Sequence, residues 1–216
     1  MSGNVAFRVW LGGLFVTVMA VLASMAYVDR PLAEFLELHV RHTQFWLWLE
    51  VTLRPLSLVA VAAMLFLLGC GIFLASGGRL GSWTQLPLLC AWAVVLGVAT
   101  EIIFKRIFGR AWPDPTFVRD HAYGFHFLHG QTHWDSFPSG TAIVSSALLS
   151  VLWDSKPHWR LPGALIVLLL LIGVIVGNFH WLSDVIGGVF VGVTVGWSTK
   201  RLISRNASDG GGETRR

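Results

Sequence analysis

Long apolar segments constrain this sequence more than any other feature. They recur along almost the whole chain and are separated by short polar stretches. A helix of about 20 apolar residues is long enough to cross the hydrocarbon core of a bilayer. Of the 216 residues, 54% are hydrophobic and 13% are charged, a balance that is too apolar for a soluble domain of this size. The sequence therefore predicts an all-α, polytopic membrane protein.

Polar breaks divide the chain into about six predicted transmembrane helices. We expect these near residues 7–28, 49–75, 86–104, 138–153, 161–176 and 185–203. Residues 1–203 should form one transmembrane domain, with the first span retained, whereas the polar, glycine-rich residues 204–216 should form a disordered cytoplasmic tail. Residues 32–43 place apolar side chains at helical spacing, which predicts a helix at the membrane interface. Glycines four residues apart in the last span, including Gly188 and Gly192, predict close helix packing.

The distribution of Lys and Arg predicts the orientation in the membrane. If both termini are cytoplasmic, most basic residues lie on the cytoplasmic side, as is usual. The opposite side would carry Arg30 and Arg41 and, in one loop after the third predicted span, a cluster of Lys105, Arg106, Arg110 and Arg119. A basic cluster on the other side indicates a bound anion, and the alternative is a different topology. The net charge of +4 does not indicate nucleic-acid binding, because the basic residues form no continuous stripe.

Three polar sites are expected on the same side of the membrane. The first is the basic stretch that begins at Lys105. In the second, Ser139 is a good N-cap and Gly140 is small, so that the start of the fourth span can offer backbone N–H groups to an anion. In the third, His180 and Asp184 are four residues apart, where the carboxylate can orient the imidazole. The other ring nitrogen is then available as a nucleophile, base or ligand.

Glu101 lies near the end of the third predicted span, where a lone carboxylate is costly. The simplest explanation is an ion pair with Lys105, four residues further on. The alternative is a proton relay that joins Glu101 to His180 and Asp184, as in a proton-coupled transporter, although no inverted repeats are evident.

Residues 105–113, 137–140 and 180–184 resemble, in order and spacing, the three signature motifs of the type 2 phosphatidic acid phosphatase (PAP2) superfamily. The resemblance implies a helical bundle related to vanadium haloperoxidases, and an integral-membrane hydrolase of lipid phosphates or diphosphates. It implies that His180 is a nucleophile that forms a phosphohistidine and that Asp184 orients it. The phosphate-binding residues would be Lys105, Arg110, Ser139, Gly140 and Thr141. This chemistry requires no metal ion and no other cofactor.

The motifs depart from the family pattern at three positions. Trp112 and Val174 stand where the family has arginines, and Thr141 stands where it has the histidine that protonates the leaving oxygen. A hydroxyl does not ionise near neutral pH, so a general-acid factor of about 10²–10⁴ is lost unless another group replaces it. The candidate replacements upstream are His121, His126, His129 and His133. A leaving group that is itself a phosphate needs little protonation, which favours an isoprenyl diphosphate as substrate.

The expected partners are a phosphorylated lipid and the bilayer. The expected location is a bacterial inner membrane, with the active site facing the periplasm and both termini in the cytoplasm. The main alternative is a catalytically inactive protein of the same fold that binds a phospholipid head group. A proton-coupled transporter is a third reading. Phosphate release that is lost in His180→Ala would support the enzyme over the lipid-binding protein and the transporter.

Overall fold

The computed structural model describes residues 3–53, 57–128 and 132–209. Within these residues helices form the regular structure, and the β-pairing is limited to an isolated bridge between Arg110 and Phe125. The longer helices are α1 (Gly3–Tyr27), α2 (Asp29–His39), α3 (Gln44–Leu53), α4 (Ser57–Ala75), α5 (Gln85–Phe108), α7 (Gly140–Ser155), α8 (Arg160–Val176) and α9 (Leu182–Asp209). The short ones are η2 (Ser82–Thr84), η3 (Pro113–Phe117), α6 (Val118–Asp120) and η4 (Pro157–Trp159). The predicted all-α fold is confirmed.

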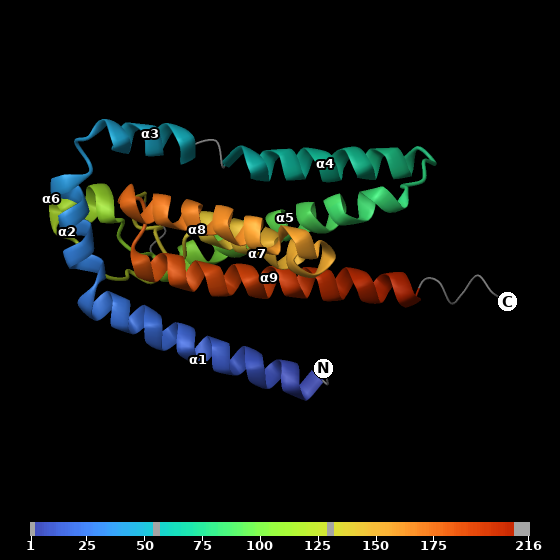
Figure 1. The fold of residues 1–216 in the computed structure, drawn as a ribbon, viewed down its shortest axis with the longest axis horizontal. Helices are drawn as coiled ribbons and strands as arrows, with labels where there is room; N and C mark the ends of the chain where they lie inside the picture. Colours follow the sequence, from blue (N-terminus) through green and yellow to red (C-terminus); the bar gives the residue numbers. More distant parts are fainter. Residues whose placement is uncertain (1–2, 54–56, 129–131, 210–216) are drawn as a thin grey trace.

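The axes of most long helices are roughly aligned, with the chain running up and down between them, and the helices form an elongated bundle (Figure 1). The short helix α6 and the transverse helix α2 lie together at one end of it (Figure 1). Helix α1 begins, and α9 ends, away from that end. Large apolar side chains cover the outside of the bundle, for example Phe15, Leu65 and Leu169, which are 67%, 62% and 68% exposed. An outer surface of this kind is suited to lipid rather than to water.

Five helical segments are long and apolar enough to cross a membrane, judged by length and composition. They are Asn4–Tyr27, Gln44–Ala75, Ser82–Phe108, Pro157–Val176 and Leu182–Ile203; the second passes through residues 54–56, which lie outside the described residues. The remaining predicted span corresponds to a shorter apolar helix, Gly140–Trp153 in α7. Helix α7 packs against α5, α8 and α9, and Ala142, Ile143 and Ala147 on it are fully buried.

Glycines bring α9 very close to α7. A Cβ atom added to Gly192 would lie 2.3 Å from the carbonyl oxygen of Ile143, and one on Gly196 would lie 2.4 Å from that of Ala147. Side chains at these positions would clash with the backbone of α7, so only glycine permits this approach. The glycine stripe of the last span is therefore used for packing within the chain.

Several boundaries differ from those expected; for example, α1 begins at Gly3 and α5 continues to Phe108. The helix predicted at 32–43 begins earlier, at Asp29, and buries Ala33 and Leu36 against the rest of the protein. Helix α9 continues to Asp209, past the expected start of the tail at residue 204. The last part of the predicted tail, 210–216, lies outside the described residues.

Candidate active site

The segment between α5 and α7 is anchored against the start of α9. Helix α5 ends at Phe108 and is capped by Gly109, which has a φ of 53°. The backbone of His126 is so close to Gly109 that an added Cβ would lie 2.0 Å from the His126 carbonyl oxygen. The backbone N–H of Ser136 donates to the carbonyl of Arg110 at 3.0 Å, and the Trp181 indole donates to the carbonyl of Ala111 at 2.7 Å. These bonds bring the first predicted polar site to the third.

The second polar site meets the third through the backbone. The N–H of Ser139 donates to the carbonyl of Asp184 at 3.1 Å, and the Ser139 hydroxyl accepts from the N–H of Ala142 at 3.4 Å. Ser139 is thus the N-cap that its sequence position predicts. Gly140 and Thr141 are the first residues of α7, so their N–H groups have no hydrogen-bond acceptor within the helix. Together with the helix dipole, these N–H groups make this end of α7 attractive to an anion.

His180 lies just before α9 and is only 9% exposed. Its Nδ1 atom is 3.6 Å from the Asp184 carboxylate and 3.5 Å from the Ser136 hydroxyl. Asp184 is itself fixed, because it accepts hydrogen bonds from the Ser136 hydroxyl and from the N–H of Trp181, the latter at 3.1 Å. This is the contact that the four-residue spacing predicts. It leaves Nε2 as the ring nitrogen that can react.

Arg110 is fully buried behind this pair. Its guanidinium donates to the Ser183 hydroxyl at 2.6 Å, to Asp184, to Asp29 at 2.7 Å and to the phenol oxygen of Tyr123 at 3.4 Å. Burial lowers the pKa of Arg110, but Asp184 and Asp29 outweigh it and hold that pKa above its usual value. We expected Arg110 to contact phosphate; with its terminal nitrogens bonded to protein oxygens, the geometry instead favours a role in positioning Asp184.

Asp29 is the charged residue of this network that sequence reasoning missed. It is 1% exposed and accepts hydrogen bonds from the Ser24 hydroxyl at 2.8 Å and from the N–H of Ser183 at 3.2 Å, besides the bond from Arg110. In the sequence Asp29 follows the first apolar span, as charged residues at the membrane interface commonly do, and only its burial distinguishes it from them.

Tyr123 lies beside Arg110 and Asp29 and has a raised pKa. Burial and the neighbouring Asp29 raise this pKa, and Arg110 lowers it by less.

Lys105 and Glu101 form the ion pair that their spacing predicts, with Nζ and Oε1 2.8 Å apart. The Glu101 carboxyl group also lies against the first residue of α7. A Cβ atom on Gly140 would be 2.1–2.3 Å from the three carboxyl atoms of Glu101. The absence of a side chain at Gly140 therefore lets an acidic group reach the N-terminus of α7.

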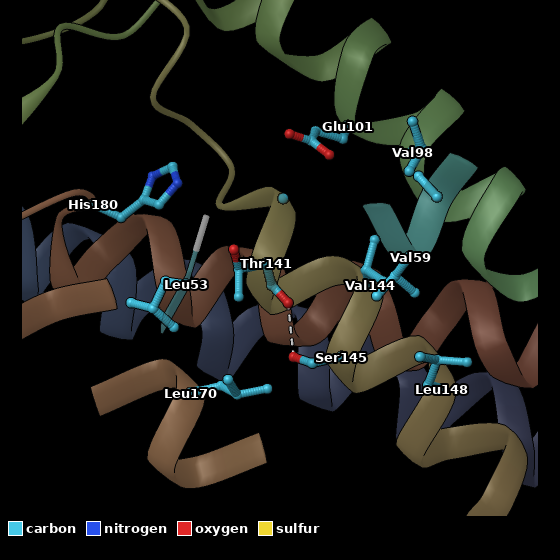
Figure 2. A pocket seen from close by; sticks show the side chains of 12 residues that line it. Leu53, Val59, Val98, Glu101, Thr141, Val144, Ser145, Leu148, Leu170 and His180 are labelled. Carbon is cyan, nitrogen blue, oxygen red and sulfur yellow. Dashed lines mark hydrogen bonds between the residues drawn. The ribbon is translucent and has the colours of Figure 1, made fainter. Parts of the chain in front are cut away.

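The candidate active site borders a cavity of about 410 Å³. Glu101, Gly140, Thr141 and His180 form its polar part, and Figure 2 shows Leu148 and Leu170 on the other side of Thr141. The other lining residues are the apolar Leu53, Val59, Ala60, Val98 and Val144, and Ser145, whose hydroxyl donates to the carbonyl of Thr141 at 2.7 Å. A polar end joined to an aliphatic chamber can hold a molecule with a charged head and a hydrocarbon chain.

The family comparison agrees with this arrangement. The family model described as the PAP2 superfamily matches residues 86–208, more than half of the 216-residue chain, and this range contains all three polar sites. The chain belongs to the PAP2 superfamily. No curated protein matched the sequence. Among solved structures, the chain is similar to the first transmembrane PAP2-type phosphatidylglycerolphosphate phosphatase from Bacillus subtilis, with 16% identity, a TM-score of 0.48, and coverage of 91% of this chain and 96% of that chain.

The three unusual positions of this PAP2 protein are all near His180. Trp112 has its ring centroid 5.7 Å from that of His180 and donates from its indole to Asp135 at 2.7 Å. Val174 is buried in an apolar cluster with Ala142. Thr141 lines the cavity. Two of the three positions where a charged or titratable side chain was expected are thus filled by apolar or aromatic packing.

The loop histidines considered as acids lie elsewhere. His121, His126 and His133 are exposed, and none of them is among the described residues that line the cavity. His126 stacks on Trp134, with ring centroids 4.0 Å apart. His129 lies outside the described residues. Within the described part of the chain, no group of three or more His, Cys, Asp and Glu side chains is placed to hold a metal ion.

Proposed function

We propose that this PAP2 protein is an integral-membrane phosphatase that hydrolyses a lipid phosphate or diphosphate, with His180 as the nucleophile. The observation that carries this proposal is the cavity, because His180 and the start of α7 occupy its polar part and aliphatic side chains line the rest. The phosphate group would bind at the N–H groups of Gly140 and Thr141. The hydrocarbon chain would extend along Leu148 and Leu170, which fits an amphiphile better than a soluble phosphate ester.

In the proposed reaction, Nε2 of His180 attacks phosphorus and forms a phosphohistidine, which water then hydrolyses. Asp184 favours this step, since its carboxylate beside Nδ1 stabilises the positive charge that the imidazole gains. Arg110 and Asp29 keep Asp184 in place from behind. Negative charge on the phosphoryl oxygens would be stabilised by the α7 N-terminus and by Lys105, which lies beside Gly140 through its contact with Glu101.

The favoured substrate is an isoprenyl diphosphate. Thr141 itself cannot act as a general acid, and a departing phosphate depends less on another proton donor than does the alkoxide that leaves from a lipid monophosphate. We place the protein in a bacterial inner membrane with the cavity toward the periplasm and both termini in the cytoplasm, on the basis of the distribution of Lys and Arg.

Phosphate release by the purified protein in lipid nanodiscs tests this function. We expect turnover of isoprenyl diphosphate, slower turnover of phosphatidic acid, and no turnover of either by His180→Ala. A phosphohistidine should be trapped on the wild type after brief exposure to labelled substrate. His158→Ala is the matched control, because His158 is exposed and does not line the cavity. Turnover that persists in His180→Ala would contradict a His180 nucleophile.

A second candidate is a non-catalytic protein that binds phospholipid head groups. It is favoured by Val174 and Trp112, which leave two usual arginine positions without a positive charge. Binding of a lipid phosphate that is weakened by Lys105→Ala, without phosphate release from any substrate, would support this candidate over the enzyme.

A further inference from the structure

We propose that Glu101 is the general acid and base of this active site and takes the place of the missing second-motif histidine. This inference rests on the proposed phosphatase function. The spacing of Glu101 and Lys105 predicted only an ion pair between them. Among the described residues that line the cavity, His180 and Glu101 are the ones with ionisable side chains.

The position of the Glu101 carboxyl group suits a proton donor. It lies against Gly140, which is the first residue of α7 and directly precedes Thr141. Figure 2 shows His180 and Glu101 on different sides of Thr141, with their polar atoms facing the same space. A phosphate held at the start of α7 would therefore have the nucleophile on one side and the carboxyl group on another, as in-line displacement requires of nucleophile and acid.

Lys105 links Glu101 to the bound phosphate. Without substrate, the carboxylate is paired with Lys105 at 2.8 Å. A phosphate anion at the same helix end would compete for this cation. Substrate binding would thus release the Glu101 carboxyl group from Lys105 and allow it to exchange a proton with the leaving oxygen and with water.

The proton balance of both steps can be written with this one residue. In the first, Nε2 of His180 bonds to phosphorus, the bond from phosphorus to the leaving oxygen breaks, and that oxygen takes the proton of the Glu101 carboxyl group. In the second, water attacks phosphorus and gives a proton to the Glu101 carboxylate. The bond from phosphorus to Nε2 breaks, which releases phosphate and neutral His180 and restores the protonated acid.

The test compares Glu101→Gln with the wild type on two substrates. Phosphatidic acid has an alkoxide leaving group that needs a proton, whereas nitrophenyl phosphate releases a stabilised phenolate. On phosphatidic acid we expect Glu101→Gln to lose a factor of about 10²–10⁴. On nitrophenyl phosphate we expect a rapid burst of nitrophenolate, about one per enzyme, followed by slow turnover with phosphohistidine accumulating. Glu34→Gln is the matched control, because Glu34 is exposed on α2 and does not line the cavity.

A residue that only neutralises Lys105 would give a different result. Equal losses on the two substrates, without a burst, would contradict the acid–base role, and so would unchanged rates on both. If Glu101→Gln does not fold, Glu101→Asp provides the test: it should slow phosphohistidine formation more with phosphatidic acid than with nitrophenyl phosphate, and equal losses would overturn the role. Activity that is absent from the wild type, or retained in His180→Ala, would instead refute the phosphatase function.

Discussion

The buried guanidinium of Arg110 should be one of the most sensitive positions for stability. Arg110 and its partners Asp29 and Asp184 are fully or almost fully buried, and Arg110→Met would leave both carboxylates without their cation. Removing one partner of a buried ion pair costs about 3–5 kcal/mol, because the other charge remains in a poorly solvating environment. Since two carboxylates lose the same partner, we expect the free energy of unfolding to fall by about 5 kcal/mol.

Reversible unfolding by sodium dodecyl sulfate in mixed micelles would measure this loss. Arg8→Met is the control, because Arg8 is exposed on α1, and should change the free energy of unfolding by less than about 0.5 kcal/mol. Asp29→Asn combined with Arg110→Met should cost less than the sum of the single changes, with a coupling of about 0.5–3 kcal/mol. A loss below about 1 kcal/mol for Arg110→Met, or strict additivity, would refute the view that this ion pair holds the site together.

The remaining predictions concern packing, capping and titration. Gly192→Ala would place a Cβ 2.3 Å from the Ile143 carbonyl and should cost about 1–3 kcal/mol in the free energy of unfolding, whereas Gly12→Ala, with no atom within 4 Å of the added Cβ, should not destabilise. Ser139→Ala removes the N-cap of α7 and should cost about 0.5–2 kcal/mol in the same assay. Because the pKa of Tyr123 is raised, its phenol should ionise above the usual value of 10.0, and Tyr123→Phe should remove this late step from an ultraviolet titration. The folded state holds this proton more tightly than the unfolded state, so stability should fall as pH rises above that value.

The parts of the fold and site that could be predicted are those that depend on local sequence. Long apolar segments predicted the spanning helices, and Gly192 predicted close helix packing. The contact between His180 and Asp184 and the ion pair between Glu101 and Lys105 each join residues four apart, so helical geometry alone brings them together. The resemblance of the three motifs predicted membership of the PAP2 superfamily, which the family comparison then confirmed.

The surroundings of other predicted site residues depend on contacts between distant parts of the chain. Arg110 was expected at the phosphate because its charge suggested an anion, but it bonds to Asp29, 81 residues earlier. The loop histidines were plausible acids by residue type, yet the described ones are exposed outside the cavity. In both cases the side chain's chemistry was known, while its direction and burial were decided by the packing of other helices.

By itself, the sequence determined that this protein is a helical membrane protein and that Asp184, one turn from His180, can contact its imidazole. These features follow from hydropathy and from helical periodicity, which act over a few residues. Only the tertiary structure decided that Asp29 and Arg110 support Asp184, and that Glu101 lies against Gly140 in the cavity with His180. The physical reason is that buried charges must find partners or polar surroundings, and the packing of the helices determines which ones are within reach.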